Sequence, residues 1–346
     1  MAEVVHGGLQ ESELAALGID PVDVLDLSAN LNPVGPHPHV LLTTREADIR
    51  RYPEADAGSL RNRIAAQSRL DPSQVLVTAG ATAAIHLAAH ALLQPGDSCV
   101  LWPPTFGEYE AAIAAAGGRI VPHVATPPAF VTDLNVAPAP LAMLCNPNNP
   151  TGVYLGRAAV EALIARLGGT LLLDVAYDPF VQDAWDADDL ARAGQPVLVV
   201  HSMTKLHAVP GVRLGYVTGP AALIARLAAL QPSWSVGTHA LVAGHAMLSI
   251  EAVQRAVLPD VTSVRTLLAD GFAQRGVEVS AGRANFVLIR VGDASWFRLA
   301  LLRRGFAVRD CTSFGLPEWV RIAVPVDVAA RRVLRAFDAA YAESRV

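Results

Sequence analysis

The sequence has 346 residues, enough for one large domain with a smaller one or for two medium domains. Hydrophobic residues make up 52% of the chain and charged residues 17%, a composition that excludes an intrinsically disordered protein. The formal net charge of −5 gives no general attraction to nucleic acid or to an anionic membrane, so an anionic ligand must be held by local charge.

Residues 1–40 are rich in proline and glycine, and we predict an ordered arm there rather than a helix or strand. Over residues 41–236, short apolar runs alternate with alanine-rich helical segments, which is typical of a mostly parallel sheet flanked by helices. Residues 237–346 differ, because a long helical stretch at 238–275 precedes two short strands and two helices. The prediction is therefore an α/β protein with an arm, a large domain (41–236) and a smaller α+β domain (237–346).

The strands predicted for the large domain lie at 75–78, 98–102, 119–124, 141–145, 170–174 and 197–201, with helices at 81–93, 108–116 and 157–167. In the smaller domain the expected strands are 277–279 and 285–291, followed by a helix near 295–304 and a terminal helix.

The cysteines Cys99, Cys145 and Cys311 are odd in number and widely spaced, which fits a reducing compartment and predicts neither a disulfide framework nor a zinc site. His37 and His39 form a loop pair without further ligands nearby, and we predict no metal site. The N-terminus lacks the pattern of a secretory signal, and no apolar run reaches the length of about 18 residues that a membrane span needs. A cytoplasmic protein is expected.

Polar side chains follow the predicted strand at 197–201. The next turn carries Ser202 and Lys205, and Arg213 lies eight residues after the lysine. Ligands of open α/β sheets bind at the carboxyl ends of the strands, and hydroxyls with an arginine are suitable donors for a phosphate. Taken alone, the stretch could also be a surface loop with a solvated lysine.

Two other strands end in candidate ligands. Asn149 lies in a rigid Asn-Pro turn after residues 141–145, where its amide can bond a ligand oxygen unless the turn is only structural. Asp174 ends the apolar run at 170–174, and burying it requires a positive partner such as a protonated pyridine nitrogen. An N-cap or surface aspartate is the alternative.

A fourth motif joins a strand to a helix through Gly80. The free backbone N–H groups of Ala81 and Thr82 would then face outward at the edge of the sheet, in an arrangement that binds anions. This motif is weak by itself, because strand–glycine–helix turns are common.

Together, the order and spacing of these residues resemble the class I and II aminotransferases, which are fold-type I enzymes that use pyridoxal 5′-phosphate (PLP). Ser202-x-Thr-Lys205 with Pro-Gly-x-Arg213, and Asn146-Pro-Asn-Asn149-Pro-Thr-Gly152, carry the resemblance, which covers essentially the whole chain. It implies an aspartate-aminotransferase-like fold, PLP as cofactor, a small phosphorylated amino-acid or amino-alcohol substrate, and a homodimer.

The resemblance also implies residue roles. Lys205 would bind the cofactor covalently and move the substrate proton, and Asp174 would pair with the pyridinium nitrogen. Tyr177 and Asn149 would bond the 3-oxygen of the ring. The other implied cofactor residues are Phe106 on the ring, Gly80, Ala81, Thr82, Ser202 and Arg213 at the phosphate, and Tyr52 at the phosphate of the neighbouring subunit. The implied substrate residues are His6, Gly7, Gly8, Asn32, Arg309 and Arg321.

The arm and the stretches at 232–236 and 308–316 further resemble the threonine-phosphate decarboxylases of cobalamin biosynthesis. On that basis we expect a PLP-dependent decarboxylase (a lyase) of an O-phosphorylated amino acid, with the arm and Asn32 helping to hold the substrate phosphate. The alternative is a histidinol-phosphate or related aminotransferase, in which such an arm merely packs across the dimer. A non-catalytic α/β binding protein is disfavoured, because Lys205, Asp174 and Arg213 are all present.

Overall fold

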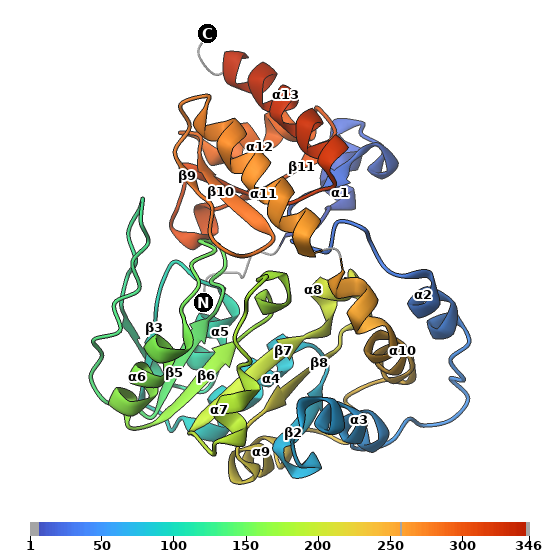
Figure 1. The fold of residues 1–346 in the computed structure, drawn as a ribbon, viewed down its shortest axis with the longest axis vertical. Helices are drawn as coiled ribbons and strands as arrows, with labels where there is room; N and C mark the ends of the chain where they lie inside the picture. Colours follow the sequence, from blue (N-terminus) through green and yellow to red (C-terminus); the bar gives the residue numbers. More distant parts are fainter. Residues whose placement is uncertain (1–6, 257, 344–346) are drawn as a thin grey trace.

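The computed structural model of the protein describes residues 7–256 and 258–343 (Figure 1). Within them, seven strands form one large sheet in the order β2-β8-β7-β6-β5-β3-β4. Only β8 runs antiparallel to its neighbours, so the expected large, mostly parallel sheet is confirmed. The strands are β2 Val75–Thr78, β3 Ser98–Leu101, β4 Arg119–Pro122, β5 Leu141–Cys145, β6 Thr170–Asp174, β7 Val197–Ser202 and β8 Gly215–Thr218.

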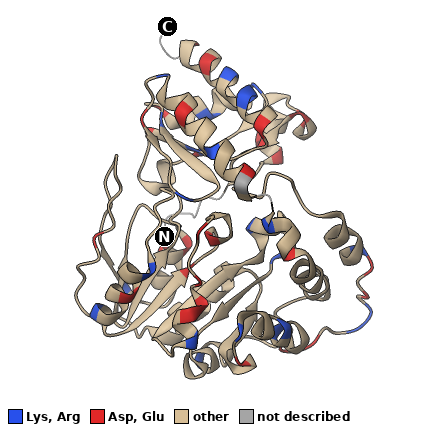
Figure 2. Ribbon diagram, in the orientation of Figure 1, with Lys and Arg blue, Asp and Glu red and all other residues tan. Residues whose placement is uncertain are grey.

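Helices cover both faces of this sheet, which is why its central strands are continuous apolar runs rather than alternating ones. One face packs against α4 (Ala81–Leu92), α5 (Glu108–Ala115) and α9 (Ala221–Ala228). The other packs against α6 (Arg157–Leu167) and α7 (Asp188–Arg192). Figure 2 accordingly shows the strands of the sheet almost free of charged residues.

The register of the parallel strands places their carboxyl ends side by side. Cys145 at the end of β5 is paired with Asp174 at the end of β6, and Asp174 with Val200 in β7. The segments that follow these strands therefore emerge at one edge of the sheet. The predicted polar residues at 149, 174 and 205 lie along that edge.

The C-terminal part of the chain forms a second layered unit, above the large sheet in Figure 1. Its four-stranded antiparallel sheet has the order β12-β13-β10-β9. This is the smaller α+β unit expected from the sequence. Its elements are α11 Leu258–Ala273, β9 Val279–Ser280, β10 Phe286–Arg290, α12 Ala294–Leu302, β11 Phe306–Ala307, β12 Arg309–Asp310, β13 Trp319–Ala323 and α13 Asp327–Glu343.

The N-terminal region contains regular structure, so the prediction of an arm without helix or strand is wrong. Helix α1 (Glu11–Leu17) ends at Gly18, and strand β1 (Leu25–Asp26) pairs in parallel with β11. Leu14 of α1 packs with Leu302 and Ala307 of the smaller unit. These elements are too short to produce a clear periodic pattern. Helix α2 (Pro38–Arg45) follows on the same side of the view, below α1 and near α10 (Thr238–Arg255) (Figure 1).

Helix α10 (Thr238–Arg255) lies with the large sheet rather than with the small one. Its buried side chains Leu241 and Met247 share a core cluster with α3 (Gly58–Ser68) and with Met203, the first residue of α8 (Met203–His207). We therefore propose a domain boundary between α10 and α11 instead of the one predicted at 236/237. Short 3₁₀ helices complete the fold at Pro21–Asp23, Pro72–Gln74, Asp178–Phe180, Pro210–Val212 and Thr312–Phe314.

Among the described residues, α10 and α11 satisfy the length and hydropathy criteria for a membrane span only when taken together across a 59° bend, and neither helix does so alone.

Candidate active site

A cavity of about 790 Å³ opens at the carboxyl ends of β5, β6 and β7, with residues of both sheet units in its wall. The predicted residues that line it are Gly7, Ala81, Thr82, Phe106, Asn149, Asp174, Tyr177, Ser202, Lys205, Arg213, Arg309 and Arg321. The fold thus brings together most of the residues selected from the sequence. The cavity is large enough for a cofactor together with a small substrate.

Lys205 lies in this cavity on the short helix α8. Its Nζ donates a hydrogen bond to the carbonyl of Ala29 at 2.9 Å and lies 5.8 Å from the ring centroid of Tyr177. Burial, and then the nearby charges of Arg321 and Arg213, lower the pKa of Lys205 to about 8. Lys205 is also the only lysine in the whole sequence, a signal that the motif analysis overlooked.

Asp174 is buried in the same cavity, with its oxygens held from two sides. Tyr109 donates its hydroxyl to Oδ2 at 2.7 Å, and the backbone N–H of Ala176 donates to Oδ1 at 2.9 Å. Burial raises the pKa of Asp174, although these hydrogen bonds and the nearby cations act to lower it. Such a carboxylate is suited to a cationic ligand group. Tyr109 was not predicted, although it lies only three residues after Phe106 at the start of α5.

The start of α4 forms a concave surface beside Arg213. Gly80, with a φ of 87°, ends the turn from β2, and a Cβ at this position would lie 2.9 Å from Nη2 of Arg213. A Cβ at Gly215 would lie 2.7 Å from the backbone N of Ala81, so β8 also needs glycine where it passes the helix. Helix N–H groups with an adjacent guanidinium suit a phosphate, as the glycine turn suggested.

Two further arginines lie on the side of the smaller unit. Arg321 donates to Oδ1 of Asn149 and, at 2.6 Å, to the carbonyl of Ser28, while its Nε has no partner among the described residues. Arg309 donates to Oγ of Ser313 at 2.7 Å, and its buried position lowers its pKa. Both guanidinium groups line the cavity and are suited to anionic groups of a substrate.

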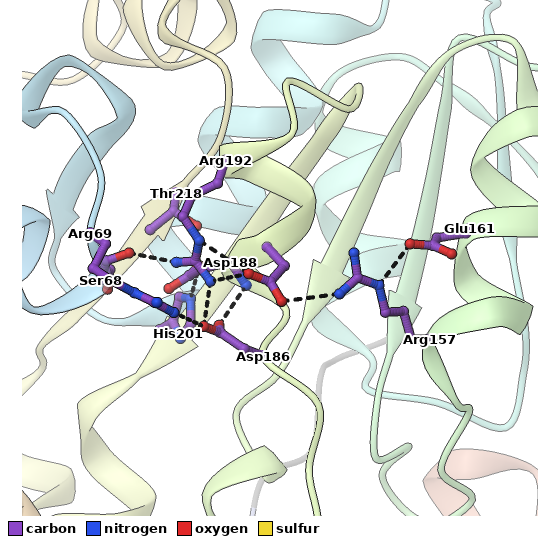
Figure 3. Close-up of polar contacts among 10 residues, drawn as sticks. Ser68, Arg69, Arg157, Glu161, Asp186, Asp188, Arg192, His201 and Thr218 are labelled. Carbon is purple, nitrogen blue, oxygen red and sulfur yellow. Dashed lines mark hydrogen bonds and ion pairs between the residues drawn. The ribbon is translucent and has the colours of Figure 1, made fainter.

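A polar network between α7 and the strands β7 and β8 supports the end of β7 (Figure 3). His201 Nε2 lies 3.0 Å from Oδ1 of Asp188, and the hydroxyl of Thr218 donates to the same oxygen at 2.6 Å. Burial alone would raise the pKa of Asp188, but the charge and hydrogen bonds of its partners lower it to about 2. Since His201 immediately precedes Ser202, this network fixes the backbone that leads into α8.

Other predicted residues lie away from the cavity. The Asn32 side chain is buried and donates to the carbonyl of Leu206 at 2.9 Å and to Gln254 at 3.0 Å, so its assignment to the substrate phosphate is corrected to a structural one. Gly8 donates its backbone N–H to Oγ of Ser28 at 2.7 Å and is not among the cavity residues. Tyr52 is exposed on the surface of this chain. The prediction for His6 lies outside the described residues.

Comparison with known proteins gives the family of the chain. The family model for class I and II aminotransferases matches residues 22–337. A histidinol-phosphate aminotransferase from Symbiobacterium thermophilum is 33% identical over 363 aligned positions, covering 99% of this chain and 97% of that protein.

The chain belongs to the class I and II aminotransferase family. The predicted aspartate-aminotransferase-like fold is confirmed, and PLP is the cofactor of this enzyme. Among solved structures, a histidinol-phosphate aminotransferase from Sinorhizobium meliloti in complex with PLP has a TM-score of 0.86 at 21% identity and covers 98% of this chain and 96% of that one. An L-threonine-O-3-phosphate decarboxylase from Porphyromonas gingivalis has a TM-score of 0.83 at 26% identity, covering 90% and 98%.

The decarboxylase predicted from the sequence is corrected by these comparisons. Curated relatives at 28–33% identity over most of the chain are named histidinol-phosphate aminotransferase. The decarboxylase resemblance had depended on the arm and on the stretches at 232–236 and 308–316, and in the arm Asn32 has partners inside the protein. The arm pattern fits the packing of an aminotransferase equally well.

The residues of the cavity fit PLP. Among the described residues, no ion pair of Asp174 with an arginine, lysine or histidine lies within 4 Å, so a ring cation can pair with this buried carboxylate. Lys205 has a lowered pKa in the same cavity, and Ala81, Thr82 and Arg213 line it together where the absence of a Cβ at Gly80 lets the guanidinium approach the start of α4. Phe106 lines the cavity as the candidate ring-stacking residue.

We expect the rate at which PLP attaches to Lys205 to rise about tenfold per pH unit and to level off near pH 8. Only the neutral amine attacks an aldehyde, and the pKa of Lys205 is about 8. Absorbance recorded after mixing PLP with cofactor-stripped full-length protein at several pH values measures this rate. A rate that keeps rising to pH 10 would instead indicate an unperturbed lysine.

Proposed function

We propose that this protein is a PLP-dependent aminotransferase of the histidinol-phosphate type, which exchanges an amino group between an amino acid and a small phosphorylated compound. The observation that carries the proposal is a cavity with Lys205 and Asp174 at the cofactor position and two further arginines, Arg309 and Arg321, in the wall. The relatives named histidinol-phosphate aminotransferase, aligned over nearly the full chain, support it.

When bound, PLP supplies an aldehyde that condenses with amines and a protonated ring that withdraws electrons from the substrate Cα. Lys205, with its lowered pKa, takes up and returns the proton at the reacting carbon. Asp174, held by Tyr109 and Ala176, would keep the ring nitrogen charged. Asn149 and Tyr177 would hold the ring through its 3-oxygen.

Arg321 and Arg309 would bind the anionic groups of the two substrates in turn. Both are buried, so a carboxylate or phosphate that pairs with them is shielded from water and held more strongly than at a surface. Arg213 lies beside the start of α4, whereas Arg309 and Arg321 lie on β12 and β13 of the smaller unit, so the cofactor and the substrate would be anchored by different cations. The smaller unit thereby contributes to substrate binding as well as to packing.

The test is an assay with histidinol phosphate and 2-oxoglutarate. We expect loss of histidinol phosphate that depends on 2-oxoglutarate and yields one glutamate per substrate consumed. Glutamate alone should convert the bound cofactor to its amine form, seen as a change in its visible absorption. The absence of glutamate formation with this pair would contradict the proposed substrate, and the absence of the spectral change would contradict amino-group transfer itself.

The proposal includes a homodimer. Tyr52 is 84% exposed and lies 5.2 Å, ring centroid to centroid, from Trp234, which is 50% exposed. Exposed aromatic pairs of this kind are typical of protein interfaces. The contact between Tyr52 and the cofactor phosphate of a second copy stays a prediction from the sequence. The cytoplasmic location does so too.

A further inference from the structure

Residues 27–32 cross the active site between the two sheet units, and we call this segment the strap. Its carbonyl groups bond successive residues of the site. The Leu27 carbonyl accepts the backbone N–H of Ala323 at 2.9 Å. The next two carbonyls accept from functional cations: Ser28 from Nη2 of Arg321 at 2.6 Å, and Ala29 from Nζ of Lys205 at 2.9 Å. A single short segment therefore contacts both the cofactor lysine and the substrate arginine.

The other end of the strap is fixed by the side chain of one residue. Nδ2 of Asn285 donates to the carbonyls of Asn30 and Leu31, at 3.1 and 3.2 Å. Asn285 is 0% exposed, and it immediately precedes β10, the strand paired with the one that carries Arg321. Beyond this point, the backbone N–H of Asn32 donates to the carbonyl of Lys205 itself at 3.0 Å.

The geometry points to Asn285 as a positioning residue of the active site. Asn285 fixes the carbonyls of Asn30 and Leu31. It thereby fixes the positions of the preceding carbonyls, those of Ser28 and Ala29, which accept hydrogen bonds from Arg321 and Lys205. No cavity residue is altered when Asn285 changes, because it is not part of the cavity wall. Both hydrogen bonds of its side-chain Nδ2 go to the strap, which is the route that we infer for its effect on the site.

The side chain of Asn30 adds a second connection. Its Nδ2 lies 3.4 Å from the hydroxyl of Tyr177, to which it donates, and Tyr177 packs edge-on against Phe286 with a centroid distance of 5.3 Å. A shift of the strap would thus also reach the phenol expected at the 3-oxygen of the cofactor. Displacements of about 1 Å are enough to reduce the productive binding of a substrate.

Two variants and one control test this role in the full-length holoenzyme. Asn285→Asp keeps the shape of the side chain but removes its N–H donors, and Asn285→Ser keeps a single donor. The control is Gln231→Ala. It also removes a side-chain donor to a backbone carbonyl, that of Val77 at 3.0 Å, and this hydrogen bond does not involve the strap. Should the aspartate variant fail to fold, the serine variant carries the test.

We expect amide hydrogen exchange in residues 27–32 to quicken by about tenfold in the Asn285 variants and to stay unchanged in the control. The kinetic part of the test rests on the proposed function: the KM for glutamate should rise about tenfold, while kcat stays within about threefold.

The two measurements separate failure of this inference from failure of the proposed function. Unchanged exchange in the strap overturns the positioning role whatever the substrate is. Faster exchange with an unchanged KM overturns it as well, because a purely structural residue would lower thermal stability without altering substrate binding. If wild-type enzyme does not react with glutamate, the proposed function fails, and the exchange measurement still decides the role of Asn285.

Discussion

Replacing Lys205 with alanine is expected to lower kcat by on the order of 10⁴ and to remove the visible absorption band of covalently bound cofactor. The amine is both the attachment point and the group that moves the substrate proton, so one substitution removes two functions. With its pKa of about 8, roughly a tenth of the Lys205 amine is neutral at pH 7, which no arginine in the cavity can match. Steady-state kinetics and an absorption spectrum of each purified protein measure the two effects.

The sequence makes this prediction unusually easy to check, because position 205 carries the only lysine. Reduction of the wild-type holoenzyme with borohydride should leave one modified lysine peptide, and the variant should give none. Lys205→Arg is the matched control: it keeps the positive charge but not the nucleophilic amine, and we expect it to lose as much activity as the alanine variant. Recovery of activity with arginine would show that charge alone is required.

The central strands could be predicted accurately because burial on both faces leaves a continuous apolar run in the sequence. Strands β5 and β6 match their predicted bounds for this reason, with all residues buried. Strand β8, Gly215–Thr218, was missed, since its four residues follow directly on the phosphate motif and look like part of a loop. The two-residue strand β1 owes its existence to pairing with β11, a long-range contact that leaves no local pattern.

The active-site residues also divide into those that follow from local sequence patterns and those that depend on long-range contacts. Lys205, Asp174 and Asn149 follow strands whose ends could be located, so their convergence could be foreseen. The contacts made by the carbonyls of Ser28 and Ala29 could not, because a backbone carbonyl is the same in every residue type. Tyr109 could have been sought from its place in the first turn of the helix predicted at 108–116, directly after the motif that contains Phe106.

The error over the decarboxylase has a physical basis. Members of this family share the cofactor residues, and the bond that reacts depends on how the substrate is oriented over the ring. Orientation can change with the displacement of a guanidinium by about 1 Å, which residue identities do not reveal. Asn32 illustrates the point, because the same asparagine that could bind a phosphate instead bonds Leu206 and Gln254 inside the protein.

Substitution of Asp174 by asparagine is expected to lower kcat by on the order of 10²–10³, or about 3–4 kcal/mol in activation free energy. The amide has nearly the same volume but cannot balance a positive ring nitrogen. In the protein, Asp174 is buried and receives hydrogen bonds from Tyr109 and Ala176, an environment prepared for a charged carboxylate despite the effect of burial on its pKa. The measurement is kcat with saturating substrate and cofactor.

Two controls separate the charge of Asp174 from its contribution to packing. A PLP analogue with a methylated ring nitrogen carries a permanent positive charge, so it should restore part of the lost rate in Asp174→Asn if that charge is what the carboxylate maintains. Tyr109→Phe removes only one hydrogen bond to Oδ2, and a smaller loss of kcat is expected from it. If the asparagine variant kept the wild-type rate, the ring nitrogen would have to be stabilised by another group, and the carboxylate at the end of β6 would lose its assigned role.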